Sequence, residues 1–408
     1  MNTQLRNRCR QILLWLVVFS FIIPASASAK RHGAKKSTVK VMTRNLYLGA
    51  DIFKVVEASQ SSDPYAIPTA VAEVYQTMLF TNFWARAEAL ADEIAAAEPQ
   101  IIGLQEVSTY YIQTPGDFLA GNPVQASTLV IDFYTVLDAA LKARRMEYTA
   151  FTVTNADIEM PMIDPNSPTY LSDARLVDHD VILVKKGHDA VEVLNNNYQA
   201  QLELDLDGGA TATFTRGYLA VDVNIKDTEY RFVNTHLEVR SAPESVFRYY
   251  QSLQMQELVG ELAYLSYLDP KPVIMVGDFN SSNEDEEGYW VHPEYGPLPY
   301  TPPYMQAADA GYLDTWLLQS KYDEGYTSGF DEYVSDPGAM LTTRIDLVFI
   351  DPVDQVLDKV KCDVVGDEIF DMIPNPNAPG YYLWPSDHAG VFAKVKFVKQ
   401  NRKIRKYR

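Results

Sequence analysis

The sequence predicts an α/β protein built as a single large domain. Short apolar runs typical of buried strands alternate with segments whose apolar residues recur at helical spacing. A length of 408 residues would by itself suggest two domains. However, six of the strand-like runs, spread from Asn45 to His388, carry polar residues suited to one chemical site at or near an end. A site assembled from both halves of the chain favours one domain.

Helices, loops and a hairpin follow from the local patterns. Three segments have helical patterning: Phe83–Ala97, 133–142 and 244–265. Segments 114–127 and 160–173 are rich in proline, glycine, asparagine and aspartate, so we expect loops there. The runs 212–224 and 229–234 flank a short polar turn at Lys226, which is typical of a β-hairpin.

The segment 283–306 is acidic at first and then dense in tyrosine and proline. One interpretation is a surface loop whose aromatic side chains cover the core. The other is a lip beside the substrate, because the segment follows Asn280 directly and aromatic rings stack on bases or enter a lipid interface.

Residues 1–29 have the pattern of a signal peptide. Three arginines precede an apolar run at 12–23, and small residues up to Ala29 suit signal peptidase. A membrane-spanning helix needs about 17–25 apolar residues, so a retained anchor is the weaker interpretation. We expect a secreted or periplasmic mature chain that starts near Lys30. Cleavage removes three arginines and no acidic residue, which changes the formal net charge from −19 to −22.

Both ends of the mature chain, 30–40 and 399–408, are basic and flank a domain at 41–398. Such runs are usually solvated tails, and the alternative is contact with an anionic membrane or nucleic acid. The acidic body argues against long nucleic-acid tracts, because phosphate contacts need lysine and arginine. Only Cys362 remains after cleavage, so the mature chain forms no internal disulfide and depends on its core.

The segment 273–282 is the most informative about chemistry. An apolar run ends at Gly277, and side chains alternate along a strand, so Asp278 and Asn280 point the same way. A carboxylate beside an amide suits chemistry on a phosphate. Alone, Gly-Asp-Phe-Asn is also a plausible turn. Five other strand-like runs carry comparable residues, which packing does not explain: Asn45, Glu106, His236, Asp346 and the pair Asp387 and His388.

In order and spacing, these motifs resemble the endonuclease/exonuclease/phosphatase superfamily, which includes deoxyribonuclease I and bacterial sphingomyelinases. The resemblance runs from about residue 38 to 399, and the opening 45–51 resembles exported bacterial members. It implies a four-layer α/β sandwich, in which two mixed β-sheets pack face to face with helices outside.

The residue types also suggest roles. Glu106, with Asn45 and Asp387, would hold Mg²⁺ or Mn²⁺, because hard cations prefer oxygen ligands; Asn45 would be a ligand or would orient Glu106. Asp278 would orient or deprotonate the attacking water, and Asn280 would donate a hydrogen bond to a phosphate oxygen.

Two histidines complete the predicted site. His236 and His388 would flank the phosphorus as acid and base, and Asp346 would hold His388 in one tautomer. In the nucleases that the chain resembles, a carboxylate often supports the first histidine, and Asp178 and Asp180 are candidates here. Arg216 would either touch phosphate or form an ion pair at a strand edge.

We therefore expect an exported, monomeric, Mg²⁺-dependent phosphoesterase that hydrolyses a phosphodiester or phosphomonoester. The substrate would be nucleic acid, a phospholipid headgroup or an inositol phosphate, and the loops that select among these have no readable code. The alternative is a catalytically silent binding module on the same fold. The presence of every expected site residue argues against that alternative.

Overall fold

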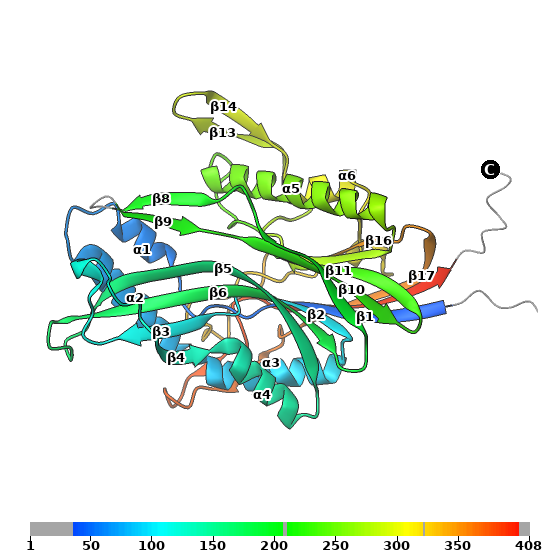
Figure 1. The fold of residues 1–408 in the computed structure, drawn as a ribbon. Helices are drawn as coiled ribbons and strands as arrows, with labels where there is room; N and C mark the ends of the chain where they lie inside the picture. The colour runs from blue at the N-terminus through cyan, green and yellow to red at the C-terminus, as the bar shows by residue number, and fades with distance from the viewer. Residues whose placement is uncertain (1–35, 207–209, 321–322, 400–408) are drawn as a thin grey trace, which may run out of the picture.

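The computed structural model describes residues 36–206, 210–320 and 323–399. Two large β-sheets pack face to face, with helices α3 (Phe83–Ala97) and α4 (Phe133–Ala143) outside one sheet and α5 (Val246–Leu268) outside the other (Figure 1). The predicted four-layer α/β sandwich is confirmed. The predicted signal peptide at 1–29 and residues 400–408 of the basic tail lie outside the described residues.

The first sheet has eight strands, and seven of them follow the order β17-β20-β1-β2-β6-β3-β4, with β5 paired to β6. β1 and β2 are parallel and the other pairs are antiparallel, so the sheet is mixed. The strands are β1 (Lys36–Asn45), β2 (Ile101–Gln105), β3 (Thr109–Gln113), β4 (Thr128–Asp132), β5 (Tyr148–Ile163), β6 (Leu171–Lys185), β17 (Gln355–Val365) and β20 (Gly390–Lys399).

The second sheet has six strands in the order β15-β16-β12-β11-β10-β7, and only β11 and β12 pair in parallel. Its register places His236 opposite Asp278 and Asp278 opposite Asp346. The strands are β7 (Ala190–Asn197), β10 (Gly217–Ile225), β11 (Thr228–His236), β12 (Val273–Asp278), β15 (Leu313–Asp314) and β16 (Asp346–Asp351).

The core lies in three apolar layers. Between the sheets, alternate residues such as Val41, Phe232 and Ile274 are fully buried. A second cluster fills the space under α3 and α4, and a third lies under α5. Each of these helices starts at a polar cap: the side chains of Asn82, Asp132 and Ser245 accept hydrogen bonds from the first turn. Burial on both faces explains why the central strands read as continuous apolar runs.

Smaller helices and strand pairs lie around the two large sheets. Helices α1 (Phe53–Ala58) and α2 (Ala66–Phe80) follow β1 and were not predicted. The other elements are the strand pairs β8 (Leu202–Leu206) with β9 (Ala210–Phe214), β13 (Gly288–His292) with β14 (Gly296–Tyr300) and β18 (Ile373–Pro374) with β19 (Tyr382–Leu383), helix α6 (Pro303–Asp309), and the short helices η1 (Phe118–Ala120), η2 (Trp316–Leu318) and η3 (Ile369–Asp371).

Several predicted boundaries were wrong. The predicted strand at 212–224 is broken, because β9 ends at Phe214 and β10 begins at Gly217. The predicted loop at 160–173 is shorter, at 164–170, because β5 continues to Ile163 and β6 begins at Leu171. The segment 283–306 is not one loop, since it contains β13, β14 and most of α6. Cross-strand pairing outweighs local composition in each case.

The basic segment at 30–40 is only partly a tail. Strand β1 begins at Lys36 rather than at 41, and Lys36 and Lys40 lie 3.6 and 3.5 Å from carboxylates of Asp358 and Glu98. Lys399 is likewise the last residue of β20. Among the described residues, no helix has the length and apolar character needed to cross a membrane.

Candidate active site

The predicted site residues converge at one edge of the two sheets. Parallel strands deliver their carboxyl ends to the same edge, and antiparallel neighbours begin there, so strand ends far apart in sequence become adjacent. A cavity of about 250 Å³ opens at this edge. Its lining includes Glu106, His236, Asp278, Asn280, Asp387 and His388. Asn45 and Asp346 are fully buried next to it.

Asn45 connects the two sheets at the site. Its amide nitrogen donates to Glu106 Oε1 at 3.0 Å and to Asp278 Oδ2 at 3.1 Å. Its oxygen accepts the Tyr47 backbone N–H at 2.8 Å, which determines which way the amide points. One lone pair of that oxygen accepts this hydrogen bond and the other is available to a cation, so both predicted roles of Asn45 are compatible with the geometry.

Glu106 lies in a setting that disfavours its charged form. Burial, followed by the negative charge of Asp387, raises the pKa of Glu106 to about 7. Its second oxygen accepts the Leu48 N–H at 2.7 Å. Burial also raises the pKa of Asp387, although His388 and Arg86 oppose that change. Two buried carboxylates that repel each other fit a hard divalent cation, which would neutralise both.

A second acidic group does not fit a metal as well. Ligand atoms of Asp278, Asp346 and His388 all lie within 4.8 Å of one another. However, His388 Nδ1 is 2.8 Å from Asp346 Oδ2, which is a hydrogen-bond distance. A hydrogen bond already engages this pair, so the group is less suited to a cation than the predicted ligands Glu106 and Asp387.

The surroundings of His388 favour its protonated, positively charged form. Burial opposes that charge, but the neighbouring carboxylates of Asp346, Asp387 and Asp278 raise the pKa of His388 well above its ordinary value. The bond from Nδ1 to Asp346 leaves Nε2 as the ring nitrogen that is free to act on a substrate. The distance from Nδ1 to Asp278 Oδ2 is 3.7 Å.

The surroundings of His236 favour its neutral form. Burial, then the positive charges of Arg216 and His388, hold the pKa of His236 well below its ordinary value. Arg216 Nη1 lies 3.1 Å from Nδ1, and Asn280 Nδ2 lies 3.3 Å from Nε2. The Asp278 carboxylate lies 3.6 Å from Nε2. The two histidines therefore flank the same carboxylate in opposite protonation states.

The prediction that Asp178 or Asp180 supports His236 was wrong. Asp178 accepts from Ser108 Oγ at 3.0 Å and from Asn155 Nδ2 at 3.3 Å. Both carboxylate oxygens of Asp180 are buried without a hydrogen-bond partner. The group that contacts His236 is Arg216, which both lines the cavity and pairs with Glu238 at 3.4 Å. Arg216 sits in the break between β9 and β10, a break that the apolar pattern did not reveal.

Sequence analysis assigned no role to Arg86. This fully buried side chain donates to the carbonyl oxygens of Leu46, Tyr47 and Pro385 at 2.6–3.0 Å. It thus ties the segment after Asn45 to the segment before Asp387. A charged residue on a helix that feeds the Glu106 strand is the only signal that the sequence offered.

Three residues at the site have an uncommon backbone conformation. Tyr47, Glu106 and Asn280 have φ angles of 60°, 56° and 49°, in the left-handed region that non-glycine residues seldom adopt. The bonds from Tyr47 N–H to Asn45 and from Leu48 N–H to Glu106 hold the first two residues in place, and Asn280 N–H donates to Asp278 Oδ1 at 2.9 Å. Such conformations persist when surrounding contacts over-determine them, and they aim side chains at a site.

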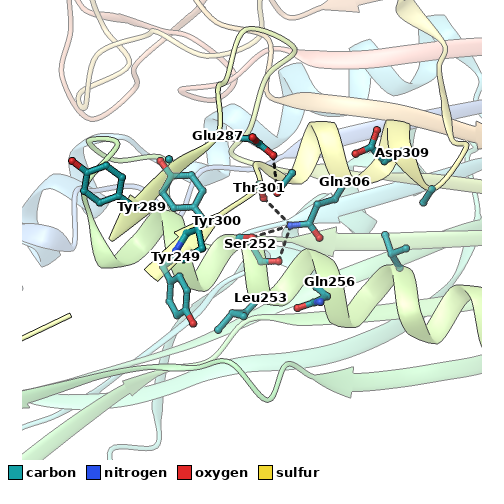
Figure 2. Close-up of a pocket in the computed structure, with 14 residues that line it drawn as sticks. Tyr249, Ser252, Leu253, Gln256, Glu287, Tyr289, Tyr300, Thr301, Gln306 and Asp309 are labelled. Carbon is teal, nitrogen blue, oxygen red and sulfur yellow. Dashed lines mark hydrogen bonds between the residues drawn. The ribbon is translucent and has the colours of Figure 1, made fainter. Parts of the chain in front are cut away.

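A larger cavity lies elsewhere. It measures about 770 Å³ and lies between α5, the β13–β14 hairpin and α6, with Tyr249, Tyr289 and Gln256 along it (Figure 2). The hairpin projects beyond α5 (Figure 1). No residue of 283–306 lines the catalytic cavity. The interpretation of this segment as a lip of the catalytic site was therefore wrong.

The sandwich and the site together define a class of hydrolases that act on phosphoester bonds. The chain belongs to the Endonuclease/Exonuclease/phosphatase family, whose sequence model matches residues 81–388. Members of this family are generally metal-dependent phosphoesterases. No curated protein matches the chain.

Solved structures resemble this fold at low sequence identity. An endonuclease/exonuclease/phosphatase family protein from Bacteroides thetaiotaomicron has 15% identity and a TM-score of 0.52, covering 90% of this chain and 100% of its own. A mannosyl-6-phosphatase from the same organism has 16% identity and a TM-score of 0.50, with coverages of 88% and 99%. At such identity the likeness shows the fold alone.

Proposed function

We propose that this protein is an exported, Mg²⁺-dependent phosphoesterase whose catalytic cavity contains Glu106, His236, Asp278, Asn280, Asp387 and His388. The observation that carries the proposal is the pair of histidines on either side of Asp278, with His236 Nε2 at 3.6 Å and His388 Nδ1 at 3.7 Å from its carboxylate. Two imidazoles around one carboxylate supply the acid and base groups that hydrolysis of a phosphoester requires.

The residues suggest a division of work. Burial and Asp346 raise the pKa of Asp278 to about 6, so its carboxylate is largely ionised at neutral pH and orients a water for attack on phosphorus. His388 Nε2–H donates to a phosphate oxygen or to the leaving oxygen. Asn280 and Arg216 add hydrogen-bond donors on the His236 side.

Glu106 and Asp387 would hold the cation, with Asn45 orienting Glu106. When bound, Mg²⁺ polarises a phosphoryl oxygen and neutralises negative charge near the leaving group. Oxygen donors without a cysteine cluster favour Mg²⁺ or Mn²⁺ over zinc.

A hydrolysis panel tests the proposal. Plasmid DNA, RNA, sphingomyelin, phosphoinositides and bis-p-nitrophenyl phosphate are incubated with Mg²⁺ and, separately, with excess chelator. We expect turnover of at least one ester with Mg²⁺, little with chelator, and a lower rate and weaker metal dependence in Glu106→Gln. Full activity in chelator would contradict the metal assignment. Metal-independent binding without any turnover would instead support a silent binding module.

The location and contacts of the chain are part of the proposal. We infer cleavage near Ala29, a secreted or periplasmic monomer, and contact of the basic residues at 30–35 and 400–408 with an anionic surface. N-terminal sequencing of the exported protein tests the first point. Sedimentation with anionic vesicles, with and without residues 400–408, tests the last.

A further inference from the structure

A small cavity of about 80 Å³ lies directly beside the catalytic cavity. Ile52, Ile158 and Leu176 line both cavities, so these three apolar side chains separate two adjacent spaces. Residues of α1, α2, β3, β5 and β6 line the small cavity, and these elements lie together at one end of the first sheet (Figure 1). An ester group on a phosphate in the catalytic cavity would lie against the shared apolar side chains and, where they move aside, in the small cavity.

The walls of this small cavity are apolar. Val71, Val74 and Met160 line it and are 7–8% exposed. Its polar side chains are already engaged: Arg175 pairs with Asp157 at 2.6 Å, and Tyr110 Oη donates to Leu48 O at 2.9 Å.

Tyr75, the remaining polar residue of the lining, packs against two apolar clusters. A base or sugar in this cavity would lose hydrogen bonds to water without replacing them, which opposes binding. Transfer of a hydrocarbon group from water into this cavity has a favourable free energy, because the group has no hydrogen bonds to lose.

The cavity sets a limit on the size of its occupant. Its volume is roughly half that of an engineered cavity of about 150 Å³ that binds benzene, so a branch of about three to four carbons fits. Ala174 leaves this room, because it is the smallest side chain in the lining.

We propose that the small cavity is a subsite for an apolar ester group, so that the substrate is a phosphodiester with a short hydrocarbon group next to the phosphate. This inference rests on the proposed function, since it assumes that a phosphoester occupies the catalytic cavity. It assigns specificity to α1, α2, β5 and β6 and not to the aromatic hairpin.

The first test is a series of p-nitrophenyl alkyl phosphates (methyl, propyl and butyl) beside the thymidine ester. Burying one methylene is worth about a fourfold gain, so kcat/KM should rise at least about tenfold from methyl to butyl and be lower for thymidine. Equal rates across the alkyl series, or a preference for thymidine, would overturn the subsite while leaving the proposed function intact. Failure to hydrolyse any ester would count against the proposed function itself.

Binding to the subsite can also be measured without turnover. Calorimetry should find dibutyl phosphate binding at least about tenfold more tightly than dimethyl phosphate, for the same reason. Equal affinities would contradict the subsite even in an inactive preparation.

A matched pair of variants locates the effect. Ala174→Met fills the cavity, so the butyl-to-methyl ratio of kcat/KM should fall about tenfold toward unity. Ala150→Met is the control, because Ala150 is also a half-buried alanine of the β5–β6 pair but lines neither cavity. The ratio within one preparation is independent of how much protein folds. An unchanged ratio in Ala174→Met would place the alkyl group elsewhere.

Discussion

His236 and His388 illustrate how neighbouring residues determine the chemistry of an identical side chain. Both are buried and both lie within 4 Å of the Asp278 carboxylate, at 3.6 and 3.7 Å. Carboxylates surround His388, whereas a guanidinium contacts His236. The first two predictions therefore change the charged neighbour of each ring, Asp346 beside His388 and Arg216 beside His236.

Asp346→Asn should reduce kcat by about tenfold or more, and His388→Ala should reduce it by about 10² or more. Loss of the carboxylate loosens the ring and lowers the pKa of His388, so the limb of the pH–rate profile that reports the loss of the His388 proton should shift to lower pH. Steady-state kinetics from pH 5 to 9 measure both effects. Asp351→Asn, at the other end of β16, is the control. An unchanged rate in Asp346→Asn would show that the pairing has no catalytic role.

Arg216→Met should raise the pKa of His236, because it removes the second cause of the low value while burial remains. The His236 ring should therefore titrate at a higher pH, and NMR of the imidazole protons measures this directly. Arg240→Met is the control and should leave the His236 titration unchanged, since Arg240 pairs with Asp285. An identical titration in Arg216→Met would mean that burial alone determines the value.

Two strands that pass through the polar site, β6 and β12, restrict which residues are tolerated at particular positions. Strand β6 places Asp180 in the interior with both oxygens unpartnered, and strand β12 passes so close to β11 that Gly277 has no room for a side chain. The buried carboxyl lowers the stability of the fold, and the close approach at Gly277 excludes larger residues. Both result from where the backbone of the strand lies.

Asp180→Asn should stabilise the protein at neutral and higher pH by about 1–3 kcal/mol, because the amide avoids the cost of burying a carboxylate charge beside Asp178. Burial, then Asp178, raises the pKa of Asp180 well above its ordinary value. Protonation of Asp180 therefore contributes to the free energy of unfolding. This contribution is complete below the pKa that the group has in the unfolded chain, and it is lost as the pH rises through the pKa that the group has in the folded chain.

Urea unfolding at pH 5 and pH 8 measures this effect. The gain from Asp180→Asn should be larger at pH 8, and the exposed Asp189→Asn should show no such difference. An equal effect of Asp180→Asn at both pH values would show that the group does not titrate on unfolding in this range.

Gly277→Ala should destabilise the fold by about 1–3 kcal/mol through overpacking. A Cβ at this position would lie 2.0 Å from the Thr235 carbonyl oxygen, in the strand pair that aligns His236 with Asp278. Gly260→Ala, within α5 and with no atom near its Cβ, should instead be neutral or slightly stabilising. Denaturant midpoints distinguish the two variants, and tolerance of Gly277→Ala would argue against this close approach.

The whole molecule is strongly acidic, with a formal net charge of −19. A polyanion that runs along its surface is repelled everywhere except near the cation site and the basic ends. A small phosphodiester needs only the cavity. Net charge therefore opposes long duplex DNA as the preferred substrate.

Nicking of supercoiled plasmid should be slow at low salt and should rise as salt screens the repulsion, whereas hydrolysis of bis-p-nitrophenyl phosphate should change little. Initial rates from about 20 to 200 mM salt with Mg²⁺ held constant test this. Efficient nicking that weakens steeply with salt is the signature of many phosphate contacts, and it would contradict the prediction.

Much of the fold was predictable, because local patterns specify much of it. Helix α3 has the predicted bounds, and the strands that end at Asn45, Gln105, His236 and Asp278 lie where apolar runs end in polar residues. Helix α2 was missed because Pro68 and mixed polarity weaken its pattern. The β13–β14 hairpin was missed because its aromatic and proline content resembles a loop.

The sequence by itself determined the family, the sandwich and the set of polar strand ends, since these depend on residue order and periodicity. The pairing of Asp346 with His388 was among the predictions, whereas only the tertiary structure decided that Arg216 contacts His236. The contact of Arg216 with His236 joins residues 20 apart, and the contact of Asp346 with His388 joins residues 42 apart. The apolar cavity likewise needs α1, α2, β3, β5 and β6 together. Protonation and cavity shape depend on distance in space, which no local pattern encodes.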